Sequence, residues 1–208
     1  MADRREIRTI QPVAIIGLGA LGRNLSVALV EHGYRLSAIY PGRTKRSRDA
    51  AALICAALGG RKAAERVRLC DSPQEAANGA RTVFLTVPDD SIKRLASSLT
   101  WNPGQVVLHC SGSAGLAPLQ DLVTQGVLCG CFHPLNTFPR LELQREPHSP
   151  DGGSRGDVPA ASIAQVLEAV TTRFKETTFA ITASDSELSA VLAGAAERIG
   201  AGSINVPA

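Results

Sequence analysis

The chain has 208 residues, 44% of them hydrophobic, which fits one α/β domain with a real core better than two full domains. Its 22 basic and 19 acidic residues leave a formal charge of +3, too small to favour nucleic acid or a membrane surface. Residues 1–6 contain no apolar signal core, and no apolar run reaches the ~18 residues of a membrane span. We expect a cytoplasmic protein whose partner is a small-molecule substrate.

Five cysteines form an odd set without a C-x-x-C pair, so buried, reduced thiols are the expectation. Cys129, Cys131 and His133 alternate along one apolar segment and would share a face of a regular strand. A metal site built from them is the alternative, but no fourth ligand is evident from the sequence, and we predict no metal.

The first element is an apolar run, Val13–Ile16, that breaks into glycines at the spacing G-x-G-x-x-G and continues into an amphipathic segment. Gly17 would allow the sharp exit from a strand, Gly19 the close approach of a pyrophosphate, and Gly22 tight packing of the helix on the strand. Backbone N–H groups at the helix start would then face the anion. The pattern predicts a strand, a phosphate-binding turn and a helix; the alternative is a glycine-rich turn in another α/β protein.

The second predicted strand, 34–40, bears on the choice of cofactor. NAD-binding domains usually carry Asp or Glu near its end, where this chain has Tyr40 followed by a basic stretch from Arg43. A carboxylate would repel a 2′-phosphate, whereas guanidinium and hydroxyl groups bind it. NADP is therefore predicted over NAD, with Arg43 and Thr44 nearest the strand end. The alternative is that residues 45–48 only begin a solvated helix that runs to Leu58.

Strands and helices then alternate. Strands are predicted at 67–69, 82–87, 105–109 and 127–132, a small helix opens at Ser72-Pro73, and further helices cover 92–99 and 116–125. Six such units predict a right-handed, doubly wound, mostly parallel sheet. Ligands bind at the carboxyl ends of parallel strands, so Val87 and Pro88 should line the nucleotide cleft. Asp89 and Asp90 are explained at least as well by capping the helix as by catalysis.

The Pro- and Gly-rich polar stretch 140–159 predicts a mobile surface loop. A helix over 160–174, a strand over 177–182, a helix over 184–199 and a short strand over 203–206 are expected after it. We therefore divide the chain into a tail, 1–11, and one Rossmann domain, 12–208.

Four motifs in order carry a family resemblance: 17–22, 85–92, 107–112 and 132–139. They resemble Rossmann-like oxidoreductases of the 6-phosphogluconate dehydrogenase-like type, related to NADP-dependent deazaflavin oxidoreductase, pyrroline carboxylate reductase and prephenate dehydrogenase. The resemblance covers Val13 to Val206. It implies the following cofactor contacts: Gly17, Gly19, Ala20, Leu21 and Gly22 on the pyrophosphate, Arg43 and Thr44 on the adenosine ribose phosphate, and Val87 and Pro88 beside the nucleotide.

The same resemblance places His109, Ser111 and His133 toward the nicotinamide and the substrate, with Ser111 among the cofactor contacts. His133 is the candidate for acid/base work because an imidazole with a pKa near 6.5 exchanges protons at neutral pH. The alternative is that its ring only binds neighbouring backbone. For His109 a structural role is the favoured interpretation.

Family members usually continue into a helical domain that completes the substrate pocket and the dimer, whereas this chain stops at Ala208. We expect that part of the site to be absent, and the apolar face of the last helix to be exposed and to favour a homodimer. Two functions stay open: an NADP-dependent oxidoreductase acting on a small carbonyl or imine, and an inactive nucleotide-binding regulatory or scaffold protein. A methyltransferase is a weaker alternative, disfavoured by the basic stretch after Tyr40.

Overall fold

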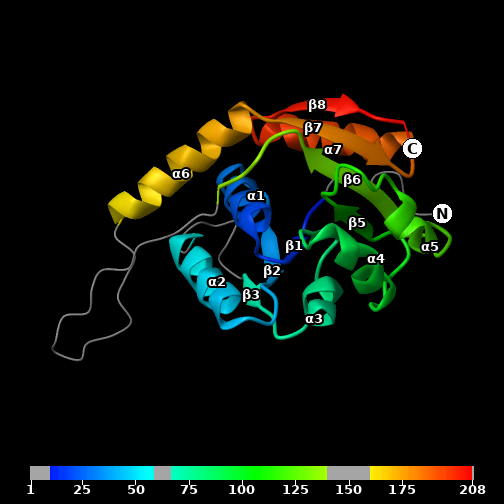
Figure 1. Cartoon of the computed structure of the whole chain (residues 1–208), viewed down its shortest axis with the longest axis horizontal. Helices are drawn as coiled ribbons and strands as arrows, with labels where there is room; N and C mark the ends of the chain where they lie inside the picture. The colour runs from blue at the N-terminus through cyan, green and yellow to red at the C-terminus, as the bar shows by residue number, and fades with distance from the viewer. Residues whose placement is uncertain (1–9, 59–66, 140–159, 208) are drawn as a thin grey trace.

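The computed structural model describes residues 10–58, 67–139 and 160–207 (Figure 1). Most of the predicted tail 1–11 and the predicted loop 140–159 lie outside these residues. Within them, no helix combines the length and the apolar character needed to cross a membrane.

An eight-stranded sheet forms the centre of the fold, with the order β3-β2-β1-β4-β5-β6-β7-β8. All neighbouring strands are parallel except β6 and β7, which are antiparallel. The first six strands have the order of a doubly wound dinucleotide-binding fold, so the predicted fold class is confirmed. The strands are β1 (Val13–Ile16), β2 (Leu36–Tyr40), β3 (Arg68–Leu69), β4 (Thr82–Leu85), β5 (Val106–His109), β6 (Leu128–Pro134), β7 (Thr178–Ala183) and β8 (Gly202–Asn205).

Helices cover the sheet in two sets, each with its own core (Figure 1). Apolar side chains at helical spacing, such as Leu25 and Leu29, are fully buried because one helix face packs against the strands. One core includes α1 (Ala20–Glu31), α2 (Lys45–Leu58), α6 (Ala160–Lys175) and α7 (Ser186–Arg198). The other includes α3 (Pro73–Asn78), α4 (Asp89–Ser97), the 3₁₀ turn η2 (Ala117–Leu119) and α5 (Gln120–Val123).

All five phenylalanines form one continuous series through the first core. Phe132 on β6 stacks on Phe179 of β7 with 3.9 Å between ring centroids, and it meets Phe84 of β4 edge to face. Phe174 of α6 then contacts both Phe179 and Phe138. Aromatic pairs of this kind add to the area they bury, so the series fixes α6 and β7 against the parallel half of the sheet.

Three expectations need correction. Helix α4 begins at Asp89, three residues early, and its N-cap is Pro88, whose side chain has no acceptor for a capping bond. The Asp89 carboxylate, in the first turn, accepts from the Ser111 hydroxyl. The segment 116–125 forms a 3₁₀ turn and one α-helical turn rather than one helix. The last helix does not expose its apolar face, since Leu188 and Leu192 are fully buried against the sheet.

Candidate functional site

A cavity of about 320 Å³ lies at the carboxyl ends of β1, β2 and β4. It is lined by Gly17, Leu18, Gly19, Arg23, Pro41, Gly42, Arg43, Thr44, Arg46, Ser47, Thr86, Val87 and Pro88. Six of the predicted cofactor contacts are among them, namely Gly17, Gly19, Arg43, Thr44, Val87 and Pro88. The topological switch point of the sheet, where β1 lies between β2 and β4, therefore carries the candidate site.

Two glycines of the turn are required by the protein itself. Gly17 has φ +103°, and a Cβ there would lie 2.7 Å from the Thr86 carbonyl oxygen. A Cβ on Gly22 would overlap the Gly17 carbonyl and lie 2.6 Å from Thr86 Oγ1. The Thr86 hydroxyl donates to the Gly17 carbonyl at 2.5 Å, which joins the turn to the end of β4.

Gly19 is different, because no protein atom demands a glycine at this position. Its φ of −66° is open to any residue, and a Cβ there would meet only the Thr86 oxygen, at 4.0 Å. Gly19 is exposed and lines the cavity at the start of α1. Because Gly19 has no side chain, a ligand in the cavity has room to approach the backbone closely.

The far side of the cavity is the start of α2. Thr44 caps this helix, since the Ser47 N–H donates to Thr44 Oγ1 at 3.2 Å. Arg43, Arg46 and Ser47 line the cavity from the same turn. The amino-terminal ends of α1 and α2 thus meet at one cavity, and both helix dipoles favour an anion there.

Three arginines line the cavity, and its described lining contains no carboxylate. Arg43 was predicted from the sequence. Arg46 was assigned only to the solvated helix start, and Arg23 was missed because it reads as an ordinary helix residue after the glycines. A basic residue directly after the third glycine, in the first turn of a helix, was the available signal.

The remaining predicted cofactor contacts lie outside the cavity lining. Ala20 and Leu21 form the first turn of α1, and Gly22 packs against Gly17. Ser111 is buried beyond the end of β5, where its hydroxyl donates to Asp89 Oδ2 at 2.6 Å. The short distance is typical of a hydrogen bond to a charged acceptor. This bond holds the Asp89 carboxylate against Ser111, between the ends of β4 and β5.

His109 holds the loop that follows β5. The Ser111 N–H donates to His109 Nδ1 at 3.1 Å, and His109 Nε2 donates to the Gly115 carbonyl at 2.6 Å. A carbonyl only accepts, so the proton is on Nε2 of the neutral ring. Burial lowers the pKa of His109, and the nearby Asp89 carboxylate opposes this effect. The favoured structural interpretation of this residue agrees with these contacts.

His133 lies inside β6 rather than after it, and its ring is half-buried. Its Nδ1 donates to the Cys110 carbonyl at 2.9 Å, which puts the lone pair of the neutral ring on Nε2. That edge of the ring lies over Gly112, where any Cβ would overlap it. Gly112 therefore makes room for the imidazole, whose Nε2 has no hydrogen-bond partner among the described residues.

The cysteines near this end of the sheet are thiols that donate to carbonyls. Cys131 donates to the Ser111 carbonyl at 3.0 Å, and Cys129 to that of Leu119 at 3.7 Å. Burial raises the pKa of Cys129 to about 12 and that of Cys131 to about 11. Within the described residues, no group of three His, Cys, Asp or Glu side chains is placed to hold a metal ion.

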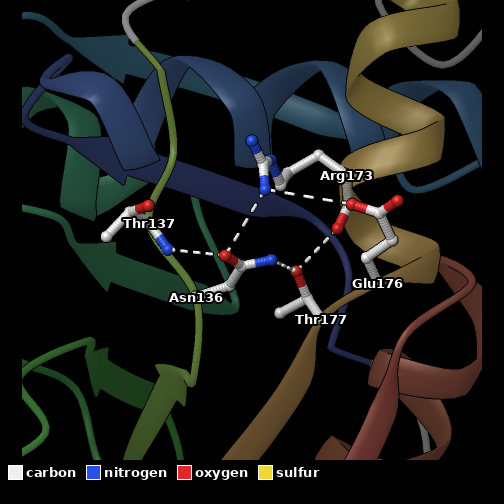
Figure 2. A network of polar contacts seen from close by, with 5 residues as sticks. All are labelled: Asn136, Thr137, Arg173, Glu176 and Thr177. Carbon is white, nitrogen blue, oxygen red and sulfur yellow. Dashed lines mark hydrogen bonds and ion pairs between the residues drawn. The ribbon is translucent and has the colours of Figure 1, made fainter.

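The segment after His133 is fixed through Asn136 to α6 and to Thr177, the residue before β7 (Figure 2). Asn136 Oδ1 accepts from the Thr137 N–H at 2.8 Å and from Arg173 at 3.5 Å, and its amide donates to Thr177 Oγ1 at 3.3 Å. Buried Asn24 of α1 donates to the Pro139 carbonyl at 2.9 Å. Residues 134–139 therefore pass from the His133 side of the sheet to the first turns of α1.

Solved structures of similar fold come from several oxidoreductases. A protein assigned as an NADP oxidoreductase from Bacteroides fragilis has a TM-score of 0.63 at 20% identity, covering 97% of this chain and 62% of its own. Pyrroline-5-carboxylate reductase from Coxiella burnetii has a TM-score of 0.61 at 15% identity, covering 96% and 60%. An imine reductase variant from Myxococcus stipitatus has a TM-score of 0.55 at 15% identity, covering 94% and 53%.

At these identities the likeness establishes the fold, and this chain spans less than two thirds of the length of each of these three structures. No curated protein matches the sequence. The model of the Rossmann-like domain family matches residues 2–134, from before β1 to the end of β6. The sheet order, the glycine turn and this match together show that the chain belongs to the Rossmann-like domain family.

Proposed function

We propose that this chain is the NADP-binding part of an oxidoreductase that transfers hydride between nicotinamide and a small carbonyl or imine substrate. The observation that carries the proposal is the cavity between the starts of α1 and α2, with three arginines and no carboxylate in its described lining. Its volume, about 320 Å³, is at the low end of small-molecule sites and suits one part of a dinucleotide.

The residues of the cavity fit the cofactor at two places. Gly19 leaves open the space that a pyrophosphate would need at the start of α1. Arg43 and Arg46 lie at the end of β2, where a ribose 2′-phosphate would carry about −1.5 to −2 charges. Tyr40 stands where NAD-specific domains usually carry an acid, which supports NADP over NAD.

The nicotinamide would supply the hydride, and the chain would supply orientation and a proton. His133 would exchange this proton at Nε2, because the Cys110 carbonyl engages its Nδ1–H. Nε2–H of the imidazolium would donate to the substrate in the reduction, and the Nε2 lone pair of the neutral ring would take the proton back in the oxidation. The Asp89 carboxylate, held by Ser111 at the end of β4, would favour a substrate with positive character, such as a protonated imine. The names of the similar structures, which include imine and pyrroline-5-carboxylate reductases, support this class.

Calorimetry with NADPH and NADH tests the proposal directly. We expect wild-type protein to bind NADPH more tightly than NADH, and the double variant Arg43→Met, Arg46→Met to lose about 10- to 100-fold in NADPH affinity with little change for NADH. Arg94→Met on α4 is the matched control, because Arg94 is exposed and outside the cavity. Absence of binding at millimolar NADPH would overturn the proposal.

A nucleotide-binding protein without turnover is the second candidate. It is favoured by the bonded state of the polar groups beyond β5, since both nitrogens of His109 and the hydroxyl of Ser111 are engaged within the protein. NADPH binding combined with no NADPH oxidation across a panel of carbonyl and imine compounds would favour this candidate over the first.

A further inference from the structure

Arg23 occupies a position that is costly for a cation. Arg23 is only 7% exposed, and it lies in the first turn of α1, at the positive end of the helix dipole. Both effects favour a neutral or acidic residue there. Long side chains on a helix point back toward its amino-terminal end, and the Arg23 side chain lines the cavity beside Gly17 and Gly19.

The guanidinium is oriented by the turn itself. Arg23 Nε donates to the Leu18 carbonyl at 3.0 Å, inside the same glycine turn. A guanidinium is planar, and its geometry matches two phosphate oxygens at once. The Arg23 guanidinium therefore binds the glycine turn and also brings positive charge to the cavity.

The three arginines divide into two groups along the cavity. Arg23 belongs to the glycine turn at the end of β1, whereas Arg43 and Arg46 belong to the end of β2 and the start of α2. In a dinucleotide laid across this switch point, the pyrophosphate lies at the start of the first helix and the ribose 2′ position near the end of the second strand.

We infer that Arg23 binds the pyrophosphate of the dinucleotide through its side chain, in addition to the backbone of the glycine turn, and holds the Leu18 peptide in place. The inference rests on the proposed function. It assigns to Arg23 a contribution shared by NADPH and NADH, and to Arg43 and Arg46 a contribution that only a 2′-phosphate receives.

Three probes separate these contributions in calorimetry: NADPH, NADH and adenosine 2′-monophosphate, which has no pyrophosphate. We expect Arg23→Met to weaken NADPH and NADH by the same factor, about 10- to 100-fold, and to leave adenosine 2′-monophosphate within about twofold. The double variant Arg43→Met, Arg46→Met should instead weaken NADPH and adenosine 2′-monophosphate and leave NADH within about twofold, and Arg94→Met should change none of the three.

Salt dependence distinguishes a phosphate contact from a merely structural role. A lost ion contact makes the dependence of dinucleotide affinity on salt concentration shallower, whereas a distorted turn lowers affinity at every salt concentration alike. Arg23→Lys keeps the charge, loses the planar fork, and should recover part of the affinity that Arg23→Met loses. It also serves as the test variant if Arg23→Met melts far below the wild type.

Equal loss of all three probes in Arg23→Met, with an unchanged salt dependence and no recovery in Arg23→Lys, would overturn the inference and leave Arg23 a structural role only. Unchanged NADPH and NADH affinities in Arg23→Met would overturn it as well. Failure of the wild-type protein to bind any dinucleotide would instead remove the proposed function on which the inference rests.

Discussion

The two ends of the functional edge of the sheet differ in how their polar groups are used. Around the carboxyl ends of β1, β2 and β4, cationic side chains line an open cavity, and the absence of a side chain at Gly19 leaves space that no protein atom fills. Around β5 and β6, the hydroxyl of Ser111, both nitrogens of His109 and one nitrogen of His133 are hydrogen-bonded to other parts of the chain.

Under the proposed function, this difference assigns nucleotide binding to the first end and turnover to the second. The β1 end is organised for an anion before any ligand arrives, because helix ends and arginines already converge there. At the β6 end the described residues leave one titratable nitrogen, His133 Nε2, without a protein partner. Changes at the first end should therefore act on nucleotide affinity, and changes at the second on turnover.

The largest effect is expected from Gly22→Ala. The added methyl group would overlap the Gly17 carbonyl, which is backbone and has little room to move. Overpacking of this kind should cost about 1 to 3 kcal/mol of unfolding free energy and abolish NADPH binding. Chemical denaturation and calorimetry measure the two effects.

Gly19→Ala is the matched variant within the same turn. A methyl group there meets nothing in the protein closer than 4.0 Å, so we expect nearly unchanged stability with strongly weakened NADPH binding. Gly194→Ala in α7, whose Cβ has no neighbour within 4 Å, should change neither quantity adversely. Normal NADPH affinity in Gly19→Ala would contradict the division between structural and ligand-facing glycines.

His133→Asn tests the other end of the edge. Loss of a general acid/base should lower kcat by about 100-fold or more, whereas the affinity for NADPH should stay within about threefold. The measurement is NADPH oxidation with 1-pyrroline or any imine that the wild type reduces. Gly112→Ala should act in the same direction, because its methyl group would displace the His133 ring. An unchanged kcat in His133→Asn would exclude the proposed role.

A smaller effect concerns stability against pH. The pKa of folded His109 lies below the ordinary value of 6.5, so the unfolded chain binds the proton more readily. Stability should be fully present above about pH 6.5 and should fall as the pH drops below it, by at most about 1.4 kcal/mol per pH unit for this group. Melting temperatures of wild type and His109→Gln from pH 7.5 to 5 check this, and the variant should show the shallower slope.

The smallest effect is expected at the thiols. Burial raises the pKa of Cys129 and Cys131, so little thiolate is present at pH 8 and both should react slowly with Ellman's reagent in the folded protein. All five cysteines should react once the chain is denatured. A fast reaction at either residue of β6 would show that this end of the sheet is more open than described.

The parts of the fold that depend on local patterns were predictable. The glycine spacing, the Ser72 cap of α3 and the alternation of strands and helices each specify structure within a few residues. Asp89 was misjudged because its position before a helix predicts capping, while its actual partner, Ser111, is 22 positions away in sequence. Rules based on neighbouring residues do not predict a contact between positions so far apart in the sequence.

The same limit applies to the candidate site. Arg43 and Thr44 were predicted because they follow a recognisable strand, and both line the cavity. Arg23 was not predicted. Its side chain points back to the Leu18 carbonyl, and this depends on how α1 packs against the glycine turn, which the sequence does not show. The tautomer of His133 likewise depends on the Cys110 carbonyl of a neighbouring strand end.

The antiparallel pairing of β6 and β7 has a practical consequence. Because β7 and β8 run against the first six strands, β8 ends at the edge of the sheet opposite the cavity, with Asn205 beside Ile181 in register. A fluorophore, a surface tether or a fusion partner attached after β8 would leave the molecule on the side away from the arginines. Immobilised protein of this kind is therefore suited to nucleotide-binding measurements on a sensor surface.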